Sequence, residues 1–205
     1  MFGIPESVLT MGTDLVRLAH LMAMAVGLGT MVSTDIMTLR RVERRISSEY
    51  CRAIESAHRI MMPAILAAWV TGIVLIAIRT GFDPANFTPK LAAKLTVVSL
   101  LTITAVVVKW QVMPIIARAE GVTLMETSLG DKLVLAVCAA MSMSGWSLAL
   151  LLGASVTFKT ADWPTLVALL VTVYMVALAT AVYSALALQS RVTMVLRQTE
   201  KLAVQ

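Results

Sequence analysis

His20 is the residue of this sequence with the clearest capacity for chemistry. It lies inside a long apolar stretch, about one turn from the end that we expect to face outside. An ionisable side chain within a membrane helix is costly and usually serves a function. Imidazole can ligate haem iron or copper, or relay a proton. A histidine that only hydrogen-bonds a neighbouring helix near the membrane interface explains the residue equally well.

Two cations are candidate companions of His20. Lys94 is expected in the same outer third of the membrane, where its ammonium could hold a haem propionate or another anionic group. Arg17, three residues before His20, falls on the same side of its helix and could assist. The alternative for Lys94 is snorkelling to the membrane surface. The predicted cofactor site therefore consists of His20 as the metal ligand, with Lys94 and Arg17 beside it.

The remaining ionisable residues of the apolar segments lie near the opposite surface. His58 is expected to differ from His20 in depth by roughly 25 Å, at 1.5 Å of rise per residue. One haem in one subunit could not take both histidines as axial ligands. Asp35 and Lys109 approach a similar depth on two different helices, and we expect a structural ion pair between them.

Fourteen methionines raise the question of copper, because thioethers suit Cu(I). Only Met1 and Met11 fall in segments expected outside, and the other methionines lie mostly within apolar helices, where flexible packing is their usual role. Copper remains the alternative to haem. A sixth ligand for a haem iron cannot be assigned, and Met143 is a guess from depth alone.

The composition indicates a membrane protein. Hydrophobic residues make up 59% of the 205 residues and charged residues 14%, and the mean hydropathy is +0.85. A soluble domain is nearer one quarter charged. The net charge of +5 does not indicate nucleic-acid binding, because the arginines concentrate in one short loop between apolar segments. The two cysteines lie in different segments and form no metal-binding pair.

We predict an all-α fold, a single integral membrane bundle of five transmembrane helices over residues 1–205. Only helices satisfy every backbone group of a single apolar segment within the hydrocarbon core. The first apolar run lacks a basic leading region and is expected to be retained as a helix. Pro114 should end or bend the third helix, whereas Asp162 and Pro164 should begin the fifth. The predicted spans are 15–39, 58–79, 92–116, 132–156 and 163–189.

The positive-inside rule predicts the orientation. The loop predicted between the first two spans, Arg40–His58, and its junction with the second helix carry six arginines, so we expect them in the cytoplasm. Five spans then place the N-terminus outside and the C-terminus in the cytoplasm. Small residues repeat every fourth position on three helices, which allows close helix packing or docking of another subunit. These are Ala64, Ala68 and Gly72; Ala149 and Gly153; and Ala177, Ala181 and Ala185.

Several short motifs resemble a bacterial membrane group, the copper-resistance CopD-like domain and the related HemJ-type protoporphyrinogen oxidases. The resemblance covers about Val16 to Met113, and Gly27 stands where the group usually has a tryptophan. The matching motifs are His20 with Gly29 nine residues later, the entry Ile60-Met61-Met62-Pro63-Ala64, the pair Thr71-Gly72, and Lys94-Leu95 followed by Val97-Val98.

The resemblance implies a protein of the bacterial inner membrane that binds b-type haem through His20, with Lys94 as a functional cation and a redox role. Whether the chain is an enzyme is left open. Two alternatives remain: a transport protein for copper or a small solute, and a non-catalytic membrane subunit that docks a partner subunit or a second copy of itself.

Overall fold

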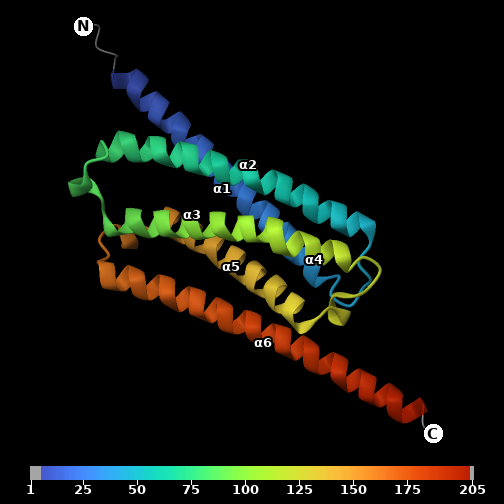
Figure 1. Ribbon diagram of the computed structural model, residues 1–205. Helices are drawn as coiled ribbons and strands as arrows, with labels where there is room; N and C mark the ends of the chain where they lie inside the picture. Colours follow the sequence, from blue (N-terminus) through green and yellow to red (C-terminus); the bar gives the residue numbers. More distant parts are fainter. Residues whose placement is uncertain (1–5, 204–205) are drawn as a thin grey trace.

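The computed structural model describes residues 6–203, and within them the chain is helical, with no strand. Five helical segments are long and apolar enough to cross a membrane, which confirms that part of the prediction. Three short 3₁₀ turns lie in the connections (Figure 1). The segments are α1 (Glu6–Leu39), α2 (Ser48–Thr80), α3 (Pro89–Val107) continued through η2 (Val108–Val112) and α4 (Met113–Arg118), α5 (Leu129–Ala154), and α6 (Trp163–Ala203).

The second helix begins three turns earlier than the predicted span. Ser47 caps α2 by accepting a hydrogen bond from the backbone N–H of Tyr50, and Glu49 stands in the first turn, where a carboxylate complements the helix dipole. The predicted Arg40–His58 loop is therefore wrong in its second half. Hydropathy marks the apolar part of a helix, and it misses charged turns that precede that part in the same helix.

Pro114 does not end the third membrane helix. A π turn, η2, precedes it, and α4 carries the helix on to Arg118. Proline has no N–H to donate to the helical ladder, and the wider π turn accommodates the missing bond. The fifth span begins as predicted: the Thr165 backbone N–H donates to the Asp162 carboxylate at 3.2 Å, and its hydrogen bonds lower the pKa of Asp162.

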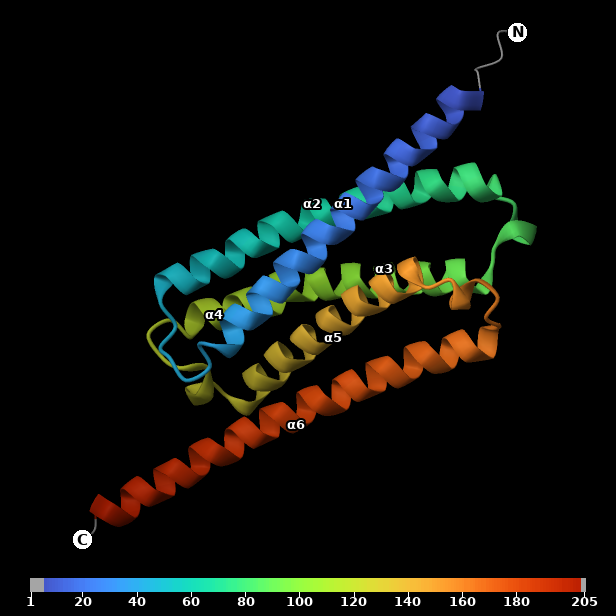
Figure 2. The same cartoon turned by 180° about the vertical axis from the view of Figure 1, so that it is seen from behind.

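The helices form an elongated bundle in which α1 packs mainly against α2, and α5 against α6 and α3. The two ends of the described chain lie at opposite ends of the bundle, as an odd number of crossings requires (Figures 1 and 2). Many large apolar side chains face outward, among them Leu21, Leu66 and Met175, each at least 60% exposed. Such a surface suits lipid and would be unusual for a monomer in water.

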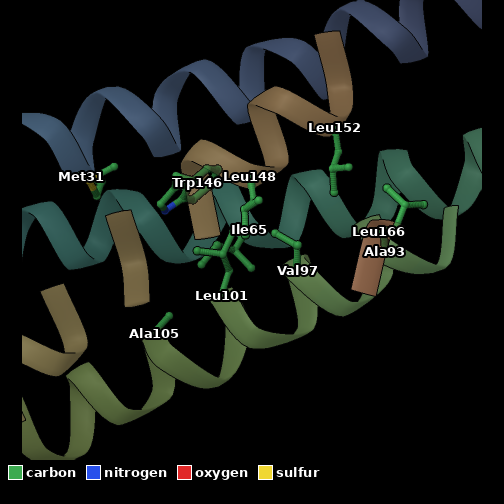
Figure 3. Close-up of a cluster of buried hydrophobic side chains, with 10 residues drawn as sticks. All are labelled: Met31, Ile65, Ala93, Val97, Leu101, Ala105, Trp146, Leu148, Leu152 and Leu166. Carbon is green, nitrogen blue, oxygen red and sulfur yellow. The ribbon is translucent and has the colours of Figure 1, made fainter. Parts of the chain in front are cut away.

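Two apolar clusters hold the bundle together. The larger cluster lies between the helices (Figure 3) and consists of Met31, Ile65, Ala93, Val97, Leu101, Ala105, Trp146, Leu148, Leu152 and Leu166. The second lies toward the end of the bundle that carries the Arg40–Ser47 loop, here called the arginine end. It consists of Ile46, Tyr50, Ile54, Val112, Ile116, Ala119, Leu124 and Cys138.

Backbone hydrogen bonds join two loops at the arginine end. The Ile46 N–H donates to the Val122 carbonyl at 2.8 Å, and the Gly121 N–H donates to the Ile46 carbonyl at 2.9 Å. The Arg45 guanidinium adds a bond to the Gly121 carbonyl at 3.0 Å. These bonds fix the Arg40–Ser47 loop to the α4–α5 connection, so the second cluster is closed over at this end.

Candidate functional site

A hydrogen bond between α1 and α2 fixes the ring of His20. Its Nδ1 lies 2.8 Å from the Thr71 hydroxyl oxygen, and that hydroxyl donates to the Ala67 carbonyl. Because a hydroxyl has one proton, the His20 Nδ1–H must be the donor in their bond, an assignment that follows from the network. Nε2 then carries the lone pair, which is the atom a neutral histidine offers to a metal or a proton.

The neighbouring residue of α2, Gly72, lies against this ring. A Cβ built on Gly72 would lie 3.5 Å from His20 Cε1, so the imidazole lies against the helix backbone there. The side chain of His20 is half-buried. Motifs that the sequence placed on two different helices, His20 and the Thr71-Gly72 pair, therefore meet at one point of the bundle.

The two predicted companions of His20 are placed differently from one another. Lys94 lies on α3, and its side chain is exposed on the bundle surface. The Arg17 guanidinium instead pairs with the Asp14 carboxylate at 2.9 Å, and both side chains are more than 60% exposed. Among the described residues, no hydrogen bond or ion pair joins Lys94 to His20, and Arg17 is paired within its own helix.

Neither further candidate ligand lies near His20. His58 is thirteen residues from Thr71 along α2, or about 20 Å at 1.5 Å per residue, so the two histidines stay apart as the sequence predicts. Trp146 packs on Gly27, seven residues from His20 on α1, and Met143 lies further toward the arginine end. Met143 is thus about 15 Å from the level of His20 and is not its opposite ligand.

This donor set suits some cofactors and not others. Among the described residues, no three His, Cys, Asp or Glu side chains gather closely enough to hold a metal ion. A bare Zn²⁺ site of the usual type needs three or four protein ligands, which His20 cannot supply alone. A haem brings its own ring of nitrogens and takes only axial ligands from the protein. His20 alone could supply one axial ligand to a haem, whereas it could not complete a Zn²⁺ site of the usual type.

The ion pair predicted between Asp35 and Lys109 is not formed. Within the described part of the chain, neither side chain takes part in an ion pair. Similar depth does not bring two residues together, because α1 packs mainly on α2 and α5 while Lys109 lies in η2 with its side chain exposed. The prediction was wrong because it used depth and ignored which helix faces meet.

Asp35 instead lines a cavity of about 160 Å³ near the arginine end, here called the Asp35 cavity. Four of the long helical segments and the turn η3 (Leu124–Glu126) supply its walls, which are mainly apolar. Sequence reasoning missed this cavity, and its one signal was the intramembrane carboxylate that had been assigned to an ion pair. The polar side chains that line it include Asp35, Thr38, Tyr50, His58, Thr104 and Ser142.

Comparison of the chain with protein-family models, with curated proteins and with solved structures finds no match in any of the three.

Proposed function

We propose that this chain is a bacterial inner-membrane protein of the CopD/HemJ-like type that binds b-type haem through His20 and has a redox role. The observation that carries the proposal is the bond from His20 Nδ1–H to Thr71, which leaves Nε2 as the free ring nitrogen. Histidines that ligate metals commonly donate their other ring N–H in this way, which fixes the orientation of the ring.

Each residue of the site has a distinct task in this proposal. His20 would hold the iron through Nε2, and the bond to Thr71 would prevent rotation of the imidazole. Gly72 lies against the ring, at a distance where a methyl group would make ordinary van der Waals contact. Lys94 would neutralise an anionic group of the cofactor, for which its exposed side chain is suited. Arg17 assists only if it leaves Asp14. The bound haem would supply one-electron chemistry at its iron.

We further propose that the arginine end faces the cytoplasm, with the N-terminus outside. Arg40, Arg44 and Arg45 lie in or beside the loop that closes this end, and Arg118 ends α4 at the same end. Cytoplasmic loops carry such an excess of arginine and lysine. The connections at the other end carry less positive charge: Lys159 lies between α5 and α6, and Arg79 and Lys90 flank the connection between α2 and α3.

A reduced-minus-oxidised absorption spectrum of detergent-purified protein tests the haem proposal, with metal analysis of the same sample. We expect a Soret band and an α-band that disappear in His20→Ala and persist in His58→Ala, the matched control for loss of a histidine. Colourless, metal-free protein from haem-replete cells would refute the proposal and favour the non-catalytic subunit. Copper without haem would favour the transport alternative.

Labelling with a membrane-impermeant maleimide tests the orientation. In a background in which Cys51 and Cys138 are both replaced by serine, a cysteine is introduced at Asn86 or at Arg44, both of which are exposed. When the reagent is added to the outer face of the intact inner membrane, we expect label on Asn86→Cys only. After lysis, which opens the cytoplasmic face to the reagent, we expect label on Arg44→Cys as well. The reverse pattern would invert the topology.

A further inference from the structure

The Asp35 cavity lies apart from the His20 site and contains one unneutralised carboxylate. Among the described residues that line it, Asp35 is the one acidic side chain. No hydrogen bond or ion pair reaches this carboxylate from the described part of the chain, although it stands in a membrane-crossing helix. A carboxylate at such a place is expensive unless something pairs with it, and it usually marks a functional site.

The hydroxyl groups around Asp35 offer acceptor atoms to the cavity. Thr34, Thr38 and Thr104 each donate to the carbonyl four residues earlier, at 2.8, 2.9 and 2.8 Å. The Tyr50 hydroxyl lies 2.9 Å from that of Thr38. Because the Thr38 proton is already used, Tyr50 donates to Thr38, and its own proton is used as well. These hydroxyls therefore present oxygen lone pairs beside a carboxylate.

The nearby cations of the protein do not neutralise Asp35. The Arg41 guanidinium lies over the ring of Tyr50, 5.9 Å from its centroid, and Lys109 is exposed on η2. The imidazole of His58 also lines the cavity, and in the described part of the chain no hydrogen bond or ion pair joins it to Asp35. The strongest acceptor of the cavity is thus left for something that enters it.

The remaining walls are apolar and set the size of an occupant. Met31, Ile65, Leu101, Ala105 and Trp146 contribute to them. At about 160 Å³, the cavity resembles an engineered cavity of roughly 150 Å³ that takes one benzene molecule. An occupant of this volume has the size of a single ring with a short substituent.

We propose that the Asp35 cavity binds a small organic cation, with an apolar body of the size of one ring and an ammonium group. The ammonium donates to the Asp35 carboxylate and to the hydroxyl oxygens beside it, while the ring packs against the apolar walls. This site does not depend on haem at His20, because the two lie at different levels of α1.

A charge series on the unaltered protein is the first test. Full-length protein in lipid nanodiscs is titrated calorimetrically with benzylamine, benzyl alcohol and benzoate, and empty nanodiscs provide the correction for partition into lipid. We expect saturable binding of benzylamine, at least about tenfold tighter than that of benzyl alcohol, and no binding of benzoate. The net free energy of a hydrogen bond to a charged group exceeds that of a neutral one by an amount that corresponds to about tenfold in affinity. Absence of saturable benzylamine binding, or equal affinity for amine and alcohol, would overturn the proposal.

Two variants locate the site. Asp35→Asn should weaken benzylamine binding about 10- to 100-fold and leave benzyl alcohol binding unchanged. Asp14→Asn, which removes an exposed carboxylate from the same helix, is the matched control and should bind like the unaltered protein. Ala105→Phe should fill the cavity and abolish binding of both compounds, so the location can be tested even if Asp35→Asn does not fold. Equal benzylamine affinity in the Asp35→Asn variant or in the Ala105→Phe variant would refute the assignment.

Discussion

The contact between Gly27 and Trp146 provides the sharpest test of the packing. A Cβ built on Gly27 would overlap the indole ring of Trp146, whose side chain is only 2% exposed. Gly27→Ala therefore forces α1 away from α5 or displaces a large ring that is packed in the main apolar cluster. By contrast, a Cβ on Gly29, two residues along the same helix, would have no neighbour within 4 Å.

The difference between these two variants isolates the contact. Both replace a helical glycine by alanine and gain the same helix propensity, which is about 0.5–1 kcal/mol in soluble hosts. Only Gly27→Ala adds an overpacking term, which is typically about 1–3 kcal/mol. We therefore expect the free energy of unfolding of Gly27→Ala to be lower than that of Gly29→Ala by about 1–3 kcal/mol.

Reversible unfolding by SDS in mixed micelles, followed by far-UV circular dichroism, measures this difference. A second substitution, Trp146→Leu, removes the ring that the new methyl group meets. In that background we expect Gly27→Ala to lose most of its penalty, and a double-mutant cycle gives the coupling directly. Equal free energies of unfolding for Gly27→Ala and Gly29→Ala would mean that Trp146 does not pack closely on Gly27. Trp146 would then not close the Asp35 cavity on the side of His20.

Three further predictions concern hydrogen bonds. Thr71→Val should weaken haem binding about 10- to 100-fold, as loss of a hydrogen bond that supports a metal ligand usually does, while Thr71→Ser should retain haem affinity. Haem titration of the apoprotein measures the affinity of each variant, and equal affinities would show that the bond to His20 is unimportant. Ser47→Ala should lower the free energy of unfolding by about 1 kcal/mol through loss of the α2 cap, and an unchanged SDS midpoint would argue against that cap. Gln189→Leu should lower the free energy of unfolding by about 1.5–3 kcal/mol, because the buried Lys132 ammonium donates to the Gln189 side chain at 2.6 Å. SDS unfolding measures this change, and an unchanged free energy would mean that water replaces the amide as acceptor.

The membrane-crossing part of the fold follows directly from the sequence. Long uncharged runs predict the five helices, and Asp162 with Pro164 predicts the start of α6. The charged beginning of α2 and the continuation past Pro114 could not be read in this way. Both depend on local backbone hydrogen bonding, the first on the Ser47 cap and the second on the π turn η2.

The surroundings of His20 were predictable only in part. The order of the short motifs placed Thr71 and Gly72 on the next helix, and the structure shows both residues against the imidazole. Its spacing from His20 suggested Arg17 as a companion, but Arg17 pairs with Asp14, which lies one turn away on the other side along the same helix. Nor could depth tell which neighbour Asp35 faces, since that depends on how α1 is rotated in the bundle.

The same helix, α1, connects the two candidate sites and also separates them. His20, Gly27 and Asp35 are spaced by seven and eight residues, or about 10 and 12 Å along the axis. Trp146 fills the level between them, where it packs on Gly27 and also lines the Asp35 cavity. A solute that crossed from the cavity to the His20 side would have to displace this indole from the main apolar cluster. The packed state therefore separates the two candidate sites and leaves no continuous path between them along α1, and a transport function would require a second conformation in which Gly27 and Trp146 come apart.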